Sequence, residues 1–321
     1  KLITTLENHQ PRAIGLDLYL DRLVQEGDID RLFRNIKDHN KLFTVCLIDG
    51  DSTIPKPKYP ENVPEQVGFS NFARDTKGVI RRHLLFGNFT NSALCDTNYA
   101  FSLQLANLYL EKEGRTAEFT DQGYLKLDDV TLRHLTEGTA AYQRANIPNN
   151  LSQILLNYRS TKSLREIATQ LSLKKILTED FDPTVVKDRI ILIGTDRPGS
   201  DYWSTPYGEK IPGVFIHAHM TSQLISAVLD GRPIIKTLSQ TTETFLIISL
   251  GFWGSGVMIL SIRSRFKFLI YFLTNVVLSI AMFAFFLTGW WLPIVPALFA
   301  FSGATALSAL GTNSKIIKQL V

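Results

Sequence analysis

The sequence predicts an α/β domain with a mainly parallel sheet and a β-hairpin at one side, followed by three transmembrane helices. Two observations lead to this prediction. Short apolar runs alternate with segments of helical periodicity over the first 240 residues, a pattern typical of strands and helices in one α/β domain. The last eighty or so residues hold three apolar runs with no Lys, Arg, Asp or Glu inside them. We therefore divide the chain into residues 1–240, a membrane region at 241–311 and a juxtamembrane tail at 312–321.

The first sixty residues predict a parallel strand–helix–strand unit. An apolar run at residues 13–18 contains Asp17, and a second run at 43–48 is followed by Asp49. Between them, residues 29–36 place apolar side chains at helical spacing. Buried-type strands joined through a helix are typical of a parallel sheet. The stretch at 55–64, rich in Pro and Lys, is predicted to be a loop.

A hairpin is predicted next. Residues 67–69 and 79–82 flank the sequence Asp75-Thr76-Lys77-Gly78. Asp and Gly favour a tight turn between antiparallel strands. The later elements alternate in type: a helix at 97–109, a strand at 154–158, a helix at 163–171, a strand at 189–194 and a helix from Pro212-Gly213 to about Leu229.

The three apolar runs are long enough to cross a membrane. They cover residues 245–262, 268–288 and 292–311, each close to the roughly 20 residues that a helix needs for the hydrocarbon core. The link at 263–267 carries two Arg and one Lys, whereas the link at 289–291 has no charge. Short basic loops stay in the cytoplasm. We therefore expect a multi-pass protein of the plasma (inner) membrane, with residues 1–240 extracytoplasmic, or periplasmic.

Composition excludes one class of partner and leaves two questions open. The net charge of +4 comes partly from Arg and Lys beside the membrane runs, and no basic stripe with interleaved aromatic residues predicts nucleic-acid binding. Cys46 and Cys95 could pair in an oxidising compartment, but nothing local forces them together. Because the chain starts at Lys1 without an export signal, we expect an upstream signal or membrane helix in the native protein.

Candidate functional residues follow two of the predicted parallel strands. Asp17 and Asp49 would lie at carboxyl ends of strands, where open α/β sheets form their ligand crevices. Each could equally cap the next helix. The loop at 194–208, which contains Asp201, follows the strongest strand and would face the same crevice. It lacks the glycine and lysine spacing of a phosphate loop or a dinucleotide site.

Neither a metal site nor a catalytic nucleophile is predicted. His217 and His219 lie two residues apart at the start of a helix, where side chains at this spacing diverge by about 200°. A serine at the centre of a Gly-x-Ser-x-Gly elbow is absent from the sequence. We therefore expect no cofactor, no metal and no catalytic residue.

Several segments recur in the order of a known family: residues 13–17, 75–82, 101–106, 157–159, 191–195, 201, 205–208 and 212–218. Together they resemble the CHASE2 family, the extracytoplasmic sensory domain of bacterial, often cyanobacterial, receptors. The most specific part is 190–217, and the three following apolar runs are similar to the family's membrane helices. The resemblance implies signal input from outside to a cytoplasmic kinase, cyclase or similar output. Only ten residues follow Gly311, so we expect the output to be missing from this chain or supplied by a separate cytoplasmic protein.

The expected function is therefore a ligand-sensing module that passes a conformational signal through its membrane helices, with coupling at residues 237–244. The expected partners are the lipid bilayer and an unknown small molecule. Small residues at 251 and 255, and at 300, 304 and 308, allow close helix contact, either inside one subunit or across a homodimer. A transporter is disfavoured because the membrane runs hold no ionisable residue.

For the ligand site we predict a crevice between Asp17, the turn containing Asp75 and Arg81, and the loop containing Asp201, with Asp49 and His217 nearby. The alternative function is a membrane-tethered extracytoplasmic enzyme, similar to a hydrolase, that uses an Asp/His crevice. Clustering of Asp17, Asp49, Asp201 and His217 around a space for a metal or substrate would favour the enzyme. Scattered, hydrogen-bonded positions would favour the sensor.

Overall fold

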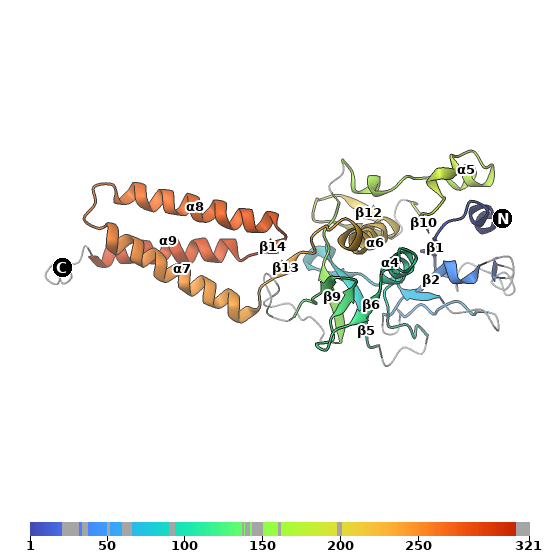
Figure 1. Cartoon of the computed structure of the whole chain (residues 1–321), viewed down its shortest axis with the longest axis horizontal. Helices are drawn as coiled ribbons and strands as arrows, with labels where there is room; N and C mark the ends of the chain where they lie inside the picture. Colours follow the sequence, from blue (N-terminus) through green and yellow to red (C-terminus); the bar gives the residue numbers. More distant parts are fainter. Residues whose placement is uncertain are drawn as a thin grey trace. The chain divides into compact units, whose positions relative to one another are not determined.

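The computed structural model describes residues 1–20, 32–33, 38–49, 52–59, 66–89, 94–136, 138, 142, 150–159, 162–197 and 201–312. The chain forms two compact units. The first, which we call the α/β unit, comprises residues 1–134 and 150–234. The second, the helical unit, comprises residues 135–149 and 235–321. Figure 1 shows both, coloured along the sequence.

A four-stranded parallel sheet forms the centre of the α/β unit. Its strands lie in the order β10 (Ile190–Ile193), β1 (Ala13–Leu16), β2 (Leu42–Cys46) and β3 (Val67–Phe69). Each neighbouring pair is parallel, which confirms the predicted parallel unit and its strands. The helix predicted between the first two strands, at 29–36, lies outside the described residues except for 32–33.

Helices cover both faces of this sheet, and the two-residue period of the strands decides which side chain meets which helix. Gly15 faces α4 (Phe101–Lys112) so closely that a Cβ built on it would lie 2.6 Å from Phe101 Cζ. Its neighbours Ile14 and Leu16 pack on the other face, in a cluster shared with α1 (Leu2–Asn8) and α5 (Leu173–Leu177). α6 (Gly213–Leu229) packs beside α4, as Figure 1 shows.

The hairpin forms at the predicted turn but from a different first strand, so that part of the prediction was wrong. Residues 67–69 belong to the parallel sheet, and β4 (Ala73–Arg74) is the antiparallel partner of β5 (Ile80–Gly87). The Asp and Gly residues indicate where the turn lies, but they do not indicate which upstream apolar run forms the antiparallel partner strand. The burial of every residue in β3 is the pattern of a strand covered on both faces. A third antiparallel strand, β9 (Leu151–Leu155), pairs with β5.

The helix predicted at 163–171 was also wrong. A short 3-10 helix covers only Leu164–Ile167, and Ala168 has extended backbone angles that end it. Two antiparallel groups were not predicted: a meander of β6 (Ala117–Phe119), β7 (Leu125–Leu127) and β8 (Val130–Leu132), and a hairpin of β11 (Tyr202–Ser204) and β12 (Lys210–Pro212).

The helical unit contains the three predicted apolar helices, α7 (Gln240–Ser261), α8 (Lys267–Leu287) and α9 (Ile294–Thr312). All three are long and apolar enough to cross a membrane. The small residues of α7 and α9 face each other within one chain: a Cβ on Gly254 would lie 2.3 Å from the Phe301 carbonyl oxygen. At one end, β13 (Lys236–Thr237) pairs in parallel with β14 (Trp290–Trp291), the turn between α8 and α9.

Candidate functional site: a pocket at the carboxyl edge of the parallel sheet

A cavity of about 390 Å³ lies where the four parallel strands end. Segments that directly follow β1, β2, β3 and β10 all contribute to its lining. The sheet reverses its strand order beside β1, because β2 and β3 lie on one side of β1 and β10 on the other. Such a reversal opens a crevice at the carboxyl ends of the strands, where open α/β sheets bind their ligands. The pocket is lined by Asp17, Leu18, Tyr19, Leu47, Asp49, Ser70, Asn71, Phe72, Arg74, Thr195, Asp201, Trp203 and His217.

Asp17 is the most buried carboxyl group of the pocket. Its backbone N–H continues the ladder of β1 by donating to the Ile193 carbonyl oxygen at 2.8 Å, and its side chain is only 9% exposed. Burial, and to a lesser extent the nearby Asp201 carboxylate, raise the pKa of Asp17 to about 8. The structure shows no hydrogen bond from this carboxyl group to any described side chain. Asp17 therefore carries a proton at neutral pH and has unused hydrogen-bonding capacity.

His217, in the first turns of α6, lies next to Asp17. Its Nε2 is 3.9 Å from Asp17 Oδ1, too far for a hydrogen bond. The imidazole packs against the rings of Phe72 and Phe101, with centroids 4.7 and 5.2 Å away, and this burial lowers its pKa to about 3. Since the pKa directions of both groups favour their neutral forms, Asp17 and His217 do not form an ion pair at neutral pH.

The neighbouring imidazole of His219 points elsewhere. Its Nδ1 accepts the backbone N–H of Arg159 at 3.3 Å, and its Nε2 bonds the Leu164 carbonyl oxygen at 2.9 Å. The two histidines therefore diverge on the helix, as predicted from their spacing. Within the described parts of the chain, no group of three or more His, Cys, Asp or Glu side chains could hold a metal ion.

Asp201 closes the pocket from the loop after β10. Its backbone adopts a left-handed φ of 49°, and one carboxylate oxygen accepts the Trp203 indole N–H at 2.6 Å. The Asp201 carbonyl oxygen accepts the N–H of Gly213, the first residue of α6. Burial raises the pKa of Asp201, although the bonds from Trp203 and Gly213 oppose that shift. The loop is thus fixed to the start of the helix that carries His217.

Two further charged side chains lie at the rim. Asp49 is exposed at the end of the segment that follows β2, and Arg74 is exposed on β4. The Arg74 guanidinium carbon lies 5.8 Å from the centre of a Trp203 ring. Of the six residues expected at the site, the pocket brings together four: Asp17, Asp49, Asp201 and His217.

Asp75 and Arg81 do not line the pocket. Asp75 lies between two guanidinium groups and accepts a hydrogen bond from Arg82 Nε at 2.8 Å. Arg82 is only 8% exposed and also donates to Gln153 Oε1 and to the Arg74 carbonyl oxygen. Arg81 is the more exposed of the two arginines. Asp75 therefore compensates a buried charge beneath the hairpin.

No local sequence pattern pointed to the aromatic residues of the pocket, Tyr19, Phe72 and Trp203, or to the nearby Arg74. Two of these residues, Phe72 and Arg74, follow β3 within five residues. If residues 67–69 had been assigned to the parallel sheet, the rule that ligands bind beyond strand ends would have pointed to them. No comparable rule identifies Trp203, which depends on the β11–β12 hairpin.

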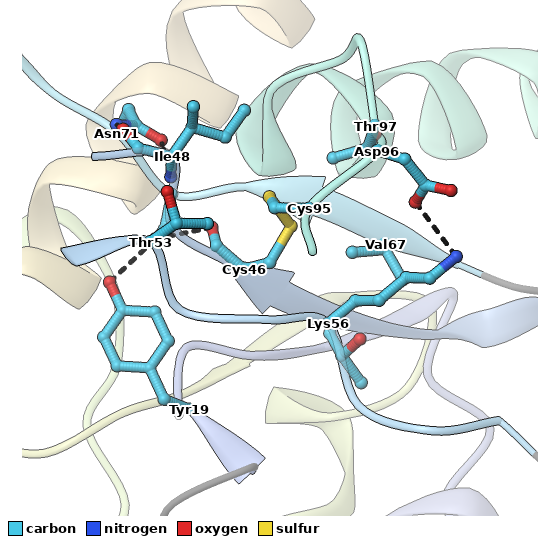
Figure 2. Close-up of a disulfide and its surroundings, with 12 residues drawn as sticks. Tyr19, Cys46, Ile48, Thr53, Lys56, Val67, Asn71, Cys95, Asp96 and Thr97 are labelled. Atoms are coloured by element: carbon cyan, nitrogen blue, oxygen red, sulfur yellow. Dashed lines mark hydrogen bonds and ion pairs between the residues drawn. A yellow bond between two sulfur atoms is a disulfide. The ribbon is translucent and has the colours of Figure 1, made fainter. Parts of the chain in front are cut away.

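A disulfide supports the same edge of the sheet. Cys46, the last residue of β2, is bonded to Cys95, and both are fully buried. Figure 2 shows the bond together with the Lys56–Asp96 ion pair, at 2.9 Å, on the same segment. The pairing that the sequence left open is thus formed, and it holds residues 94–97 against β2 directly before the pocket residue Leu47.

The pocket combines two protonatable carboxyl groups, a neutral imidazole and aromatic rings around a space for a small molecule. By the criterion set above, the clustering of Asp17, Asp49, Asp201 and His217 around this space is an observation in favour of the enzyme. The chain was also compared with known proteins. A family model described as the CHASE2 domain matches residues 1–256. No curated protein and no solved structure matches the chain.

Proposed function

The chain belongs to the CHASE2 domain family, and from this premise we propose that it is the ligand-sensing module of a membrane receptor. Its sensory domain is extracytoplasmic, carries a disulfide and precedes three candidate membrane spans. In the proposal, a small molecule binds in the pocket beside Asp17, and the bound state is passed to the membrane helices. The protein performs no catalysis of its own.

The observation that supports ligand binding is the state of Asp17. A carboxyl group that is nine-tenths buried and makes no hydrogen bond to a described side chain is unfavourable. Such a group is retained where a ligand supplies the missing partner. Its position beyond the end of β1, beside the reversal of strand order, is the usual place of a ligand in an open α/β sheet.

We further propose that residues 1–240 form the sensory part, 241–311 cross the plasma membrane three times and 312–321 form a cytoplasmic tail. The basic link between α7 and α8 supports the orientation, because such links stay in the cytoplasm. The signal would then reach a cytoplasmic output protein, or an output domain of the native chain. A homodimer is compatible with the exposed apolar faces of the three helices, which the bilayer covers as well.

The coupling element of this proposal is the short strand pair at the start of the helical unit. Lys236 and Thr237 immediately precede α7, and they pair with Trp290 and Trp291 between α8 and α9. The Lys236 ammonium also lies 5.6 Å from the Trp290 ring centre. A displacement of residues 236–237 would therefore act on all three helices together, and a ligand that binds two states of the α/β unit differently would bias the helices.

The alternative function is a tethered hydrolase-like enzyme, and the clustering of Asp17, Asp49, Asp201 and His217 is the observation in its favour. A protonated Asp17 beside a neutral His217 is a pair that could donate and accept a proton. Against it, the serine and threonine side chains among the described lining residues are Ser70 and Thr195, and neither is placed as an activated nucleophile. The Ser70 hydroxyl is engaged with Tyr19 and with the Cys46 carbonyl oxygen.

The experiment that tests the proposal is a screen of small metabolites against the full chain in lipid nanodiscs, read as a shift of the thermal unfolding midpoint. A compound that binds only the folded state raises the midpoint in proportion to its affinity and concentration. A saturable binder that is recovered unchanged, and whose shift is lost in Asp17→Asn, is the expected result. Consumption of the compound on incubation would favour the enzyme, and an unchanged shift in Asp17→Asn would remove the proposed site.

A further inference from the structure

We propose that the pocket takes a small organic cation, a protonated amine whose ammonium group lies between the Asp17 and Asp201 carboxyl groups and whose carbon skeleton packs against Phe72 and Trp203. This inference rests on the proposed sensing function, because it names the chemical class of the signal.

Asp17 has unused hydrogen-bonding capacity, whereas Asp201 is partly engaged. Asp17 has no hydrogen-bonding partner among the described side chains, although its side chain is only 9% exposed. Asp201 uses one carboxylate oxygen for the Trp203 indole at 2.6 Å, while the other packs on the backbone of Gly213. An ammonium group has three N–H donors and no acceptor, so it suits a site that offers carboxylate acceptors.

No described side chain places a competing positive charge inside the pocket. His217 is the basic side chain beside Asp17, and burial keeps it neutral. The other cation in the lining, Arg74, is exposed at the rim, as is Asp49. Charges at the rim are screened by water and salt. Asp201 is exposed as well, so the buried acidic group of the pocket is Asp17. Since no described cationic side chain lies beside Asp17 in the inner part of the pocket, this part would disfavour an anion.

Aromatic side chains line the pocket. The rings of Phe72 and Trp203 meet edge to face, with centroids 5.3 Å apart, and Tyr19 lines the same cavity. Aromatic faces attract organic cations and also accept apolar carbon atoms. A metal ion would use neither property, and the described residues hold no metal-binding group of three or more side chains. The cavity of about 390 Å³ has room for a small ligand.

Binding of a cation should change the protonation state of Asp17. Asp49, Arg74, Asp201 and His217 line the pocket together with Asp17, and burial gives Asp17 a raised pKa. A positive ligand favours the ionised carboxylate, so binding at neutral pH should release a proton. Calorimetry in buffers with different ionisation enthalpies would report this release directly.

The test uses three probes of similar shape and different charge: benzylamine, benzyl alcohol and benzoate. Titration calorimetry of the full chain in nanodiscs, at pH 7.5, compares their affinities for the wild type. We expect benzylamine to bind at least about tenfold more tightly than either other probe, since hydrogen bonds to charged groups typically contribute this much. Asp17→Asn and Asp201→Asn should each weaken benzylamine binding about tenfold or more. Asp121→Asn, an exposed turn position remote in sequence from the pocket segments, should leave it unchanged.

Two results would overturn the proposal. The first is benzyl alcohol or benzoate binding as tightly as benzylamine. The second is a folded wild type that binds no benzylamine at 10 mM. Both comparisons use the wild type alone, so they hold even if an Asn variant fails to fold. The metabolite screen tests the sensing function separately. If a neutral or anionic compound binds the pocket in that screen, the sensing function stands and the cation proposal fails.

Discussion

The Asp201 carboxylate occupies the space that a side chain on Gly213 would need: a Cβ built on Gly213 would lie 2.3 Å from Asp201 Oδ2 and 3.0 Å from its Cγ. The first residue of α6 and the loop after β10 are therefore fitted to each other. The fit explains why a glycine begins this helix without any need for a left-handed backbone there.

Replacing Gly213 with Ala should displace the Asp201 carboxylate from the pocket. We expect a loss of about 1–3 kcal/mol of stability, the usual effect of inserting a methyl group into a packed site, together with weaker ligand binding. Thermal unfolding of the full chain in detergent measures the first effect. Gly256→Ala is the matched control, because a Cβ at that helical position meets no atom within 4 Å. Equal behaviour of the two variants would contradict the prediction.

Asp75 should be a stability residue. Asp75→Asn removes the negative charge from the buried Asp75–Arg82 ion pair, and breaking such a pair typically destabilises a protein by about 3–5 kcal/mol. The expected result is a clearly lower unfolding midpoint. Glu118→Gln, in the exposed Lys126–Glu118 pair, should change the midpoint little. A midpoint for Asp75→Asn within error of the wild type would show that Arg82 finds another partner.

Stability should fall as the pH rises from about 6.5 to 8. Asp17 has a folded-state pKa of about 8, above its ordinary 3.8, so the folded chain holds a proton that the unfolded chain has lost in this window. Each such proton changes stability by up to about 1.4 kcal/mol per pH unit. The raised pKa of Asp201 acts in the same direction. Asp17→Asn should flatten the slope of the unfolding midpoint between pH 6.5 and 8, and an unchanged slope would contradict the assignment.

The buried histidines should act with the opposite sign at lower pH. Burial lowers the pKa of His217 and His83 to about 3 and that of His219 to about 4, so the unfolded chain binds protons that the folded chain does not as the pH falls below 6.5. This loss should persist in Asp17→Asn, which separates the two effects in one pH series.

Reduction of the Cys46–Cys95 bond should destabilise the α/β unit by roughly 4 kcal/mol, because the bond closes a loop with a sequence separation of 49. The measurement is the unfolding midpoint with and without reductant. The double variant Cys46→Ala/Cys95→Ala should start from the lower midpoint and show no response to reductant. A wild type that ignores a reductant, with its thiols shown to be free by alkylation, would contradict the predicted contribution.

The orientation of the chain can be read from the access of a membrane-impermeant maleimide in right-side-out vesicles. The native cysteines are paired, so single introduced cysteines give a clean signal. Asp121→Cys should react at once, whereas Ser264→Cys, in the basic link between α7 and α8, should react only after permeabilisation. The reverse pattern would place the sensory domain in the cytoplasm.

Local sequence signals located most of the fold and part of the site. The buried runs that became β1, β2 and β10, the helix from Gly213 and the three candidate membrane helices each carry their own pattern of apolar residues. Asp17 and Asp49 were selected because a carboxylate after a parallel strand lies at a predictable edge of the sheet. Signals of this kind depend on neighbours a few residues away, so they can be read without knowing the rest of the chain.

Pairings between distant segments could not be read in this way. The tertiary structure decided that residues 67–69 join the parallel sheet, that Asp75 pairs with Arg82 and that Cys46 meets Cys95. It also decided that Trp203 and Phe72 complete the pocket around Asp17. The sequence by itself determined the class of fold, the three long apolar helices and the carboxylates at the strand ends, because period and charge are local properties. The pocket depends on the order of the strands in the sheet. The burial of Asp17 and the loss of water around it arise from contacts between segments far apart in the chain, which the sequence does not reveal.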